Sequence, residues 1–500
     1  MLVTLVKQGL LFRCPRETFS DILKSGGSAV DAAIAALICT SVMNPQSSGL
    51  GGGVVFTIYN ASKGMVEVIN ARETVPRVFL HNLLSGCAAG FPVGKDRDWI
   101  AVPGELRGYE AAHKRYGRLP WKALFEPTIK VLSEPLVISP VMEKFIHHPA
   151  FASLGKSLWF LKRGETFRWP ALQQTLRVVA ENGAAAFYEG QIGKALVEDI
   201  RRAGSSMSLE DLKAYKAEVS SALNITLNSH TTVFSPGPPM GGAVLLFILK
   251  ILEGKLHEAS LATPEERVET YHRIAEALKF GNIYVSLLSL QEAVGPMLSD
   301  ELAQLARHRI DARGDHPLTH YNLLEPIYNH RYKSKGTSHV SVLAADGSAV
   351  SATIIASPAT CQVHRVPARA VYQKCKTLGL QKPPSAMVPS ILISKTGDML
   401  VIGGAGGAWI VSATSMAIIN KLWFGYDLEH AISAPIMHTE GDSILFEDHF
   451  SEEVRSGLLG RGHKEKKVKF AMNVVQGITK EGKCISAYSD KRKLGKSAGY

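Results

Sequence analysis

The sequence contains no apolar run long enough to cross a membrane. Its longest apolar stretch is GGAVLLFILKIL at residues 241–252, far short of the roughly 20 residues that a transmembrane helix needs. The first residues, MLVTLVKQGLLFRCPRETFS, are apolar only in short, interrupted pieces, unlike the core of an ordinary signal peptide. We therefore expect neither a membrane anchor nor a signal peptide in the chain as it stands.

Cysteine is also scarce. The six cysteines, Cys14, Cys39, Cys87, Cys361, Cys375 and Cys484, are far apart, without a C-x-x-C pair or a metal-ligand spacing with histidine. We therefore expect no metal site, and the cysteines alone do not report the redox compartment. Two N-x-S/T tripeptides, at Asn60 and Asn224, favour a secretory route only slightly, because such tripeptides often arise by chance.

Acidic residues are outnumbered, with 45 Asp and Glu against 56 Lys and Arg, a formal net charge of +11. The excess is dispersed, apart from RGHKEKKVKF at 461–470 and KRKLGK at 491–496. A dispersed excess is typical of a solvated surface, with a patch for nucleic acid or an anionic membrane as the alternative. Because no nucleic-acid-binding motif accompanies the charge, we expect no nucleic-acid partner.

The remaining composition is that of a soluble globular protein. Hydrophobic residues make up 46% and charged residues 20% of the 500 positions. No internal repeat and no disordered-type region interrupts the chain. This length suits two or three domains or one large layered domain.

A glycine cluster, GLGGG at 49–53, follows a predicted helix. Ser28 and Asp31 form a capping-box pattern before a run rich in Ala, Ile and Leu, and Pro45 requires that the helix has ended. A dinucleotide-binding loop follows a strand and opens a helix. Here the order is reversed, which favours close backbone packing or a tight turn, with nucleotide binding as the alternative.

Two strand-like runs come next, VVFTIYN at 54–60 and MVEVINAR at 65–72, and ASKG joins them in a predicted hairpin. Arg72 lies at the end of the second run. An arginine at a strand end usually forms a surface ion pair. Its alternative use is bidentate binding of a substrate carboxylate.

Between about residues 103 and 330 the pattern is mainly helical. Breaks at Gly117 and Pro120 separate two predicted helices, and ERVETYHRIAEALKFGNIYVSLL supplies a further amphipathic one. Histidines such as His113 and His272 have no metal-ligand partner four residues on. We interpret them as ordinary surface or core residues.

The character of the sequence changes at residue 337. TSHVSVLAADGSAVSATII alternates on both sides of an Asp-Gly turn, which predicts a hairpin with Thr337 as its first residue. AMVPSILISKTGDMLVIGGAGG predicts a second hairpin that ends in glycines, and AWIVSATSMAIINKLWFG predicts a helix directly after it. A strand, a glycine loop and a helix N-terminus together present backbone N–H groups that suit a developing oxyanion.

Thr337 is a candidate nucleophile because of what precedes it. An N-terminal threonine can use its own α-amine as the base, and the reference pKa of that amine is about 7.7–8.0. To become an N-terminus, Thr337 must first attack the carbonyl of Gly336, and glycine tolerates the strained geometry of that attack. A Gly-Thr pair before a strand is also an ordinary strand start, so spacing alone does not decide between the two.

Several long stretches resemble the γ-glutamyltransferase family, also called glutathione hydrolases, and most closely its leukotriene C4-cleaving branch. The matching stretches are GGSAVDAAIAALICTSVMNPQSSGLGGGVVFTIYN, VEVINARETVP, VPGELRGYEAAHKRYGRLPW, GTSHVSVLAADGSAVSAT, SAMVPSILI, VIGGAGG and SDKRKLGKSAGY. They run in family order from about residue 20 to residue 500, which makes the resemblance more specific than any single motif.

The resemblance implies an α+β fold, the N-terminal-nucleophile hydrolase fold, which is a four-layer αββα sandwich. It also implies a precursor that cuts itself. Residues 1–336 would form the large (heavy) subunit and residues 337–500 the small (light) catalytic subunit, and the two would together make one folded unit. Thr337 would cut the chain after Gly336 and then act as the catalytic nucleophile.

The resemblance further implies the substrate-binding residues. Arg72 would bind the α-carboxylate of the γ-glutamyl group, and Ser385 in PPSAMVP would add a hydroxyl to that carboxylate. Gly406 and Gly407 would supply oxyanion N–H groups.

The implied substrates are glutathione, its S-conjugates and leukotriene C4, with water, an amino acid or a dipeptide as acceptor. No metal or organic cofactor would be needed. By resemblance, the protein would be a glycoprotein at the extracellular face of the plasma membrane.

The sequence departs from the family pattern after Thr353. The family continues with Ser-Thr-Ile-Asn, whose threonine orients the nucleophile and whose asparagine contacts substrate, whereas this chain has Ile-Ile-Ala-Ser at 354–357. Residues 358–383 include no Asp or Glu, although the family binds the substrate ammonium with amide and acidic side chains there. Ala386 replaces the second serine of a family pair.

Two alternatives therefore stand beside a γ-glutamyl hydrolase. One is a family-fold protein, or a truncated isoform, that is catalytically impaired or inactive. The other is an unrelated nucleotide-binding enzyme that uses GLGGG.

Overall fold

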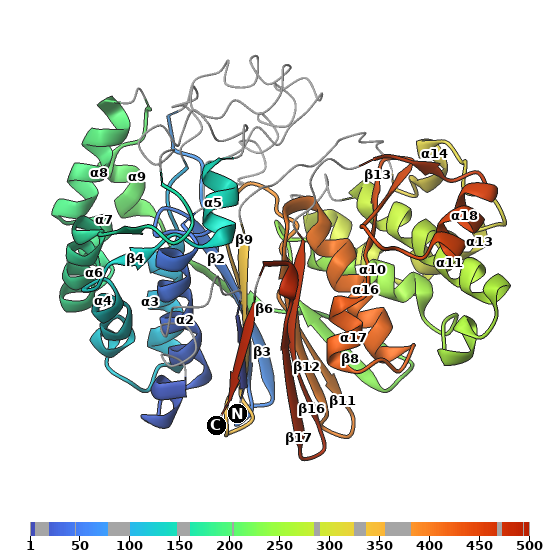
Figure 1. Cartoon of the computed structure of the whole chain (residues 1–500), viewed down its shortest axis with the longest axis horizontal. Helices are drawn as coiled ribbons and strands as arrows, with labels where there is room; N and C mark the ends of the chain where they lie inside the picture. Colours follow the sequence, from blue (N-terminus) through green and yellow to red (C-terminus); the bar gives the residue numbers. More distant parts are fainter. Residues whose placement is uncertain are drawn as a thin grey trace. The chain divides into compact units, whose positions relative to one another are not determined.

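The computed structural model describes residues 2–5, 20–45, 47–78, 101–147, 161–202, 205–284, 291–324, 337–355, 382–467, 473–493 and 495–499. The chain divides into two compact units. Unit 1 comprises Met1–Ser221, Lys335–Pro383 and Lys493–Tyr500, and unit 2 comprises Ala222–Ser334 and Pro384–Arg492. Each unit combines a large antiparallel sheet with helices that pack on it (Figure 1).

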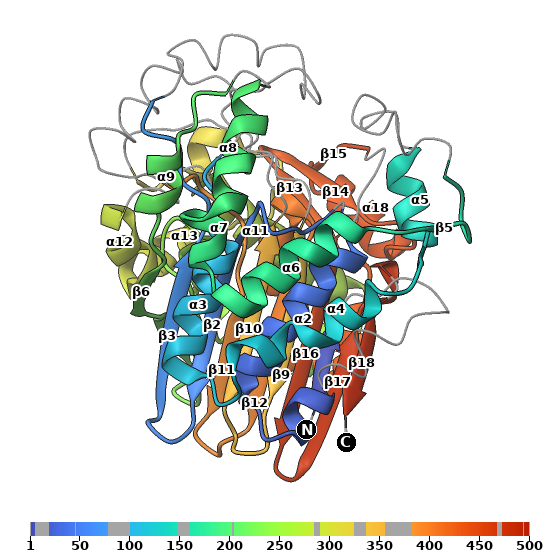
Figure 2. The same cartoon turned by 90° about the vertical axis from the view of Figure 1, so that its left-hand side faces the viewer.

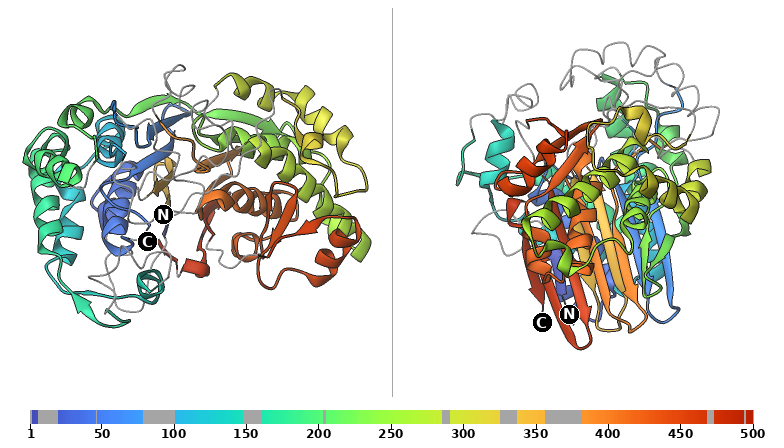
Figure 3. Two further views of the ribbon diagram at one scale, coloured as in Figure 1. Left: turned by 90° about the horizontal axis from the view of Figure 1, so that it is seen from above. Right: turned by 90° about the vertical axis from the view of Figure 1, so that its right-hand side faces the viewer.

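Unit 1 is built on a seven-stranded antiparallel sheet with the order β18-β1-β9-β10-β2-β3-β6. Its strands are β1 (Leu2–Leu5), β2 (Gly53–Asn60), β3 (Met65–Ala71), β6 (Glu218–Ser221), β9 (Thr337–Leu343), β10 (Ala349–Ile355) and β18 (Lys496–Gly499). The strands nearest the two chain ends, β1 and β18, pair with each other beside β9 (Figure 3). One sheet thus joins the beginning, the middle and the end of the sequence.

Helices α2 (Ala29–Met43) and α3 (Glu105–Tyr116) pack against this sheet (Figure 2). Ser28 Oγ accepts the N–H of Asp31 at 3.0 Å, and the Asp31 carboxylate accepts the N–H of Ser28 at 2.9 Å. The predicted capping box is therefore confirmed, and α2 ends before Pro45 as predicted.

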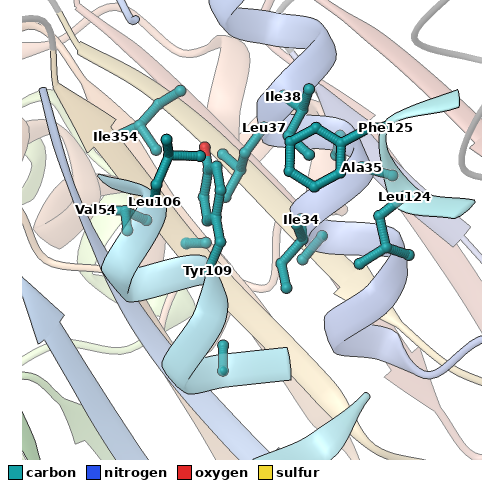
Figure 4. Close-up of a cluster of buried hydrophobic side chains, with 14 of the residues drawn as sticks. Ile34, Ala35, Leu37, Ile38, Val54, Leu106, Tyr109, Leu124, Phe125 and Ile354 are labelled. Carbon is teal, nitrogen blue, oxygen red and sulfur yellow. The ribbon is translucent and has the colours of Figure 1, made fainter. Parts of the chain in front are cut away.

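The hydrophobic core of unit 1 lies between these helices and the sheet. Every position from Ala29 to Val42 is buried. Ile34 and Ile38 of α2 gather in one cluster with Tyr109 of α3 and Ile354 of β10 (Figure 4). Each fully buried side chain of this size stabilises the fold by about 1.5–3 kcal/mol, so this cluster is what fixes α2 and α3 on the sheet.

Further elements belong to unit 1. They are α4 (Glu126–Val131), α5 (Pro140–Ile146), α6 (Pro170–Asn182), α7 (Ala185–Tyr188), α8 (Gln191–Arg202), α9 (Leu209–Ala214) and the two-stranded sheet of β4 (Leu136–Val137) and β5 (Thr166–Phe167). The predicted break at Gly117 is confirmed, since α3 ends there with the Gly117 N–H donating to the carbonyl of His113.

Unit 2 is built on a six-stranded antiparallel sheet with the order β17-β16-β12-β11-β8-β7. Its strands are β7 (Leu223–Leu227), β8 (Thr231–Ser235), β11 (Ser390–Ser394), β12 (Met399–Ala405), β16 (Val474–Glu481) and β17 (Cys484–Ser489). Its helices are α10 (Gly242–Leu252), α11 (Pro264–Asn282), α12 (Val294–Leu298), α13 (Asp300–Arg309), α14 (Leu318–Tyr321), α16 (Ile410–Leu422), α17 (Leu428–Ser433) and α18 (Glu452–Gly460). A small sheet holds β13 (Met437–Glu440), β14 (Ser443–Phe446) and β15 (Lys464–Glu465).

The longest apolar run of the sequence forms α10, a core helix of unit 2. All of its residues except Lys250 are buried. Within the ranges given above, no helix is both long enough and apolar enough to span a membrane.

The prediction of a mainly helical segment from about 103 to 330 is wrong over residues 218–235, which form β6, β7 and β8. In β7, buried Ile225 and Leu227 alternate with exposed Asn224 and Thr226. The turn between β7 and β8 has positive φ angles at Asn228 and Ser229, a conformation typical of a tight hairpin turn. The helical pattern on both sides of this segment masked a short alternating run.

The three predicted hairpins form β2–β3, β9–β10 and β11–β12, and the helix predicted after the glycines forms α16. The expected α+β class is confirmed. The predicted subunit division at 336/337 stays a prediction. It does not coincide with the two structural units, because each large sheet includes strands from both sides of residue 337.

Candidate functional site

Thr337 is the first residue of β9 and lies at one end of the sheet of unit 1. Its cross-strand partner in β10 is Ile355, and Ile355 pairs with Gly53 of β2. Thr337 is 1% exposed, and the Nζ of Lys493 donates to its carbonyl at 3.5 Å. Gly336, the residue before the predicted cut, lies outside the described residues.

The last two glycines of the cluster at 49–53, Gly52 and Gly53, lie against neighbouring backbone carbonyls. A Cβ on Gly52 would lie 1.8 Å from the carbonyl oxygen of Ile355, and a Cβ on Gly53 would lie 2.7 Å from that of Ala71. No other residue fits so close an approach. The interpretation as close backbone packing is confirmed for Gly52 and Gly53, and the N–H of Gly52 donates to the carbonyl of Gly49 in a turn. The order of helix, glycines and strand is as predicted.

His339 was not singled out from the sequence, yet it lies two residues after Thr337 in the same strand. Its Nδ1 lies 2.8 Å from Thr353 Oγ1, and its Nε2 lies 3.0 Å from Ser341 Oγ. Complete burial lowers the pKa of His339 to about 3, so the imidazole is neutral at physiological pH. The alternating T-S-H-V-S pattern was the available signal, because alternate strand residues share one face.

Arg72 directly follows β3 and is 4% exposed. Its Nη1 donates to the carboxylate of Glu73 at 2.8 Å, and its Nε donates to the carbonyl of Pro383 at 3.2 Å. The sequence-based expectation of a surface ion pair is wrong, because the side chains of Arg72 and Glu73 are only 5% and 4% exposed. A buried arginine at this position remains a candidate for binding a carboxylate.

A second buried carboxylic acid lies near Glu73. The hydroxyl of Tyr109 donates to Glu105 Oε1 at 2.6 Å, while Glu105 Oε2 has no partner among the described residues. Burial raises the pKa of Glu105 well above its usual value, and the negative charge of Glu73 raises it further. Glu105 is therefore protonated at a pH where an exposed glutamate is ionised.

Ser385 and its neighbours belong to unit 2. The N–H of Ser385 donates to the carbonyl of Pro239 at 2.8 Å, and its Oγ accepts the N–H of Met387 at 3.3 Å. Ser385 and Ala386 are each 1% exposed. Backbone bonds therefore fix the position of the Ser385 hydroxyl.

Gly406 and Gly407 connect the end of β12 to a 3-10 turn, Gly407–Trp409, that leads into α16. Their φ angles are +133° and +65°, values that favour glycine. A helix N-terminus carries N–H groups without intrahelical partners and a partial positive charge. The oxyanion-binding role of the two glycines stays a prediction.

Within unit 1, Thr337 and Arg72 lie at the same end of the sheet. Thr337 of β9 pairs with Ile355 of β10, and Ile355 pairs with Gly53 of β2. Gly53 lies beside the end of β3, which Arg72 directly follows. Adjacent strands lie about 4.8 Å apart, so the strand positions of Thr337 and Arg72 are about 14 Å apart.

Within unit 2, Ser385 precedes β11 and Gly406 follows β12. Since Ser390 pairs with Ile402 in these antiparallel strands, Ser385 and Gly406 also lie at one end of their sheet. The predicted site residues thus form two groups, one at an end of each sheet.

Among the residues that the structure describes, no group of three or more His, Cys, Asp or Glu side chains could hold a metal ion.

Solved structures share this fold. A cephalosporin acylase from Bacillus halodurans superposes with a TM-score of 0.79 at 22% identity, covering 100% of this chain and 95% of the acylase. A γ-glutamyltranspeptidase from Helicobacter pylori superposes with a TM-score of 0.53 at 23% identity, covering 61% of this chain and 92% of that one. At these identities the likeness concerns the fold alone.

The sequence comparisons find relatives of higher identity. The chain is 45% identical to the human glutathione hydrolase 5 proenzyme over 532 aligned positions, covering 96% of this chain and 90% of the human protein. It is 30% identical to glutathione hydrolase 3 of Arabidopsis thaliana over 541 positions, covering 97% of this chain and 83% of that protein.

The family model described as "Gamma-glutamyltranspeptidase" matches residues 17–355 and 377–500. The unmatched stretch between them begins directly after Ile355 and lies within the segment that departs from the family pattern. Since the two matched ranges make up most of the sequence and a 45% identical relative spans nearly all of it, the chain belongs to the gamma-glutamyltranspeptidase family of enzymes.

Proposed function

We propose that this chain is a self-processing γ-glutamyl hydrolase and transferase whose nucleophile is Thr337. The observation that carries the proposal is the position of Thr337, which is the first residue of β9 at the sheet end that Arg72 also occupies. The family match runs without a break through this hairpin to Ile355.

Self-processing would begin with attack of the Thr337 hydroxyl on the carbonyl carbon of Gly336. The peptide nitrogen leaves that carbon, so that an ester replaces the amide and the Thr337 amine becomes free. Water then hydrolyses the ester, which releases the Gly336 carboxylate. Thr337 becomes an N-terminus whose α-amine can act as its own general base.

Catalysis would repeat the same chemistry on substrate. The Thr337 hydroxyl attacks the γ-glutamyl amide, its proton passes to the α-amine, and the amine product leaves with that proton. Water resolves the acyl-enzyme ester by hydrolysis, or an amino acid or dipeptide takes the γ-glutamyl group. N–H groups of Gly406 and Gly407 would stabilise the oxyanion of each step.

Arg72 would bind the substrate α-carboxylate, with Ser385 adding a hydroxyl. Arg72 is buried and lies at the sheet end that Thr337 also occupies, which supports the assignment of Arg72.

The proposed donors are glutathione, glutathione S-conjugates and leukotriene C4. The relatives named glutathione hydrolase support the first of these, and the other two are proposed on the resemblance of the sequence to the leukotriene C4-cleaving branch. We place the protein at the extracellular face of the plasma membrane. The disulfide bond of Cys39 supports this location, because disulfides persist in oxidising compartments.

A second candidate function is that of a family member with impaired catalysis. One observation favours it: Ile355, which replaces a hydroxyl-bearing residue of the family pattern, is the cross-strand partner of Thr337.

Denaturing gel electrophoresis of the purified protein separates the two candidates. The enzyme should migrate as two fragments that meet at residue 337, and Thr337→Ala should migrate as one intact chain. Release of p-nitroaniline from γ-glutamyl-p-nitroanilide then measures turnover. A single intact band together with no turnover would leave only the impaired family member.

A further inference from the structure

We propose that Glu218 is a positioning residue for Arg72, which it fixes through Asn70 on one side and Lys382 on the other. The inference rests on the proposed function, because it concerns how the arginine that binds the substrate carboxylate is held. All of the residues involved belong to unit 1.

The first connection runs through Asn70. Glu218 of the edge strand β6 pairs with Asn70 of β3 in the register of the sheet. Asn70 Nδ2 donates to Glu218 Oε2 at 2.9 Å, and Asn70 Oδ1 accepts the backbone N–H of Arg72 at 3.1 Å. One amide side chain thus joins the Glu218 carboxylate to the backbone of Arg72.

The second connection runs through Lys382. Lys382 Nζ lies 3.2 Å from Glu218 Oε1, and the lysine side chain is only 6% exposed. The next residue, Pro383, accepts a hydrogen bond from Arg72 Nε at 3.2 Å. Anchoring Lys382 therefore places the carbonyl that holds the guanidinium.

Tyr215 contacts both Arg72 and Lys382. Its hydroxyl donates to the carbonyl of Arg72 at 2.7 Å. The Nζ of Lys382 lies 5.1 Å from the centre of its ring, within the range of a cation–π interaction. Three groups thus hold Arg72: Asn70 accepts its N–H, the Tyr215 hydroxyl donates to its carbonyl, and the Pro383 carbonyl accepts its Nε–H. Each of these groups contacts Glu218 or Lys382 or is next to Lys382 in the chain.

Glu218 is the exposed member of this group of contacts. Lys382 is buried, and desolvation lowers its pKa while the charge of Glu218 raises it. Glu218 is 62% exposed, so its own contribution to global stability is small. Replacing Glu218 should therefore disturb the placement of Arg72 without unfolding the protein.

The experiment compares Glu218→Gln with wild type in two measurements. Calorimetric titration with L-glutamate, which carries the same α-carboxylate as the donor, gives a Kd. Turnover of γ-glutamyl-p-nitroanilide gives kcat and KM separately. We expect Kd and KM each to rise about tenfold, a cost typical of a small misplacement in a binding site. kcat should change less than KM, because Glu218 acts through the group that binds the carboxylate.

Two further variants sharpen the comparison. Lys382→Met removes one connection, so adding Glu218→Gln to it should raise KM by less than Glu218→Gln does in wild type. Glu67→Gln is the matched control, because Glu67 lies in the same strand β3, faces Ser221 of β6 and pairs with Arg115 at 2.7 Å. The control should leave Kd and KM within twofold of wild type.

Arg72→Lys distinguishes this inference from the proposed function. If it weakens glutamate binding and Glu218→Gln does not, the inference about Glu218 is overturned and the role of Arg72 stands. If Arg72→Lys leaves glutamate binding unchanged, Arg72 is not the carboxylate-binding group and both fail. An equal rise of KM in Glu218→Gln and Glu67→Gln would also overturn the inference, since it would reflect a general effect on the strand pair.

Discussion

Thr337 and Ile355 are partners across the antiparallel strands β9 and β10, and both are buried. Ile355 is also the last residue before the stretch that the family model does not match. The candidate nucleophile therefore has an apolar side chain as its cross-strand neighbour, where the family pattern has a hydroxyl. Such a side chain offers no hydrogen bond to orient the Thr337 hydroxyl.

The first prediction concerns this pair. Ile355→Thr should increase the self-cleaved fraction and raise kcat, because a hydroxyl opposite Thr337 can accept or donate a hydrogen bond. Densitometry of denaturing gels over time measures the first effect, and p-nitroaniline release measures the second. Ile354→Thr is the control, since Ile354 lies in the hydrophobic core on the other face of β10, and it should give no gain. Equal cleavage in wild type and Ile355→Thr would contradict the prediction.

The second prediction concerns the glycines beside Thr337. Gly52→Ala should destabilise the protein by at least about 1–3 kcal/mol, the usual cost of overpacking, because its Cβ would meet the carbonyl of Ile355 at 1.8 Å. It should also slow self-cleavage, since the clash displaces the strand paired with Thr337. Gly51→Ala is a close control, because nothing lies within 4 Å of its added Cβ. Urea unfolding followed by tryptophan fluorescence provides the measurement. Equal urea midpoints for Gly52→Ala and Gly51→Ala would contradict the prediction.

The third prediction concerns acid. Burial lowers the pKa of His339 to about 3 and that of His438 to about 4, whereas an unfolded histidine titrates near 6.5. The stability that each neutral imidazole contributes is therefore complete above about pH 6.5 and is lost as the pH falls toward the folded value. Between pH 7 and pH 5 this amounts to about 2 kcal/mol per histidine.

Urea unfolding at pH 7 and pH 5 tests this directly. The wild-type free energy of unfolding should fall with the pH, and His339→Gln should show a smaller fall, because glutamine does not titrate. A variant with the same pH dependence as wild type would exclude His339 as a source of the acid sensitivity.

The fourth prediction concerns a buried ion pair in unit 2. Lys279 Nζ lies 3.0 Å from Glu276 Oε1 on α11, and both side chains are fully buried. The same Nζ donates to the carbonyl of Gly314 at 2.8 Å and lies 2.9 Å from Nδ1 of His463. Lys279→Met leaves Glu276 buried without its partner, which should cost about 3–5 kcal/mol.

A matched pair on the same helix serves as the control. Arg273 and Glu269 lie 2.7 Å apart and are each 39% exposed, so Arg273→Met should cost at most about 0.5 kcal/mol. The difference between the two variants in chemical unfolding is the quantity to measure. A cost for Lys279→Met as small as that for Arg273→Met would show that the buried pair contributes little.

Local sequence signals predicted the elements of the site well. The capping pattern of Ser28 and Asp31, the Asp-Gly turn after Thr337 and the glycines after β12 each depend on residues close in sequence. Such short-range patterns predict the structure correctly because a few neighbouring residues determine each turn and cap. The hairpin β7–β8 was missed because its alternating run is short and lies between helical segments.

The position of the buried charges could not be predicted in the same way. Arg72 was expected at a strand end, and it lies there, but its burial depends on Pro383, more than 300 residues away in sequence. The same holds for Lys382 and Glu218, because Glu218 is the first residue of β6 and Lys382 lies among the residues before β11. A single sequence contains no signal for such a contact.

The sequence determined the hairpins β2–β3, β9–β10 and β11–β12, the close approach at Gly52 and Gly53 and the place of Thr337 at the start of a strand, because these depend on local alternation and on side-chain size. Its long, ordered resemblance also indicated the family. Tertiary structure alone decided that Arg72 is buried and held by Glu73 and Pro383, that His339 is a neutral core residue, and that Ile355 is the partner of Thr337. Those outcomes depend on strand register and desolvation, which arise only when distant segments pack together.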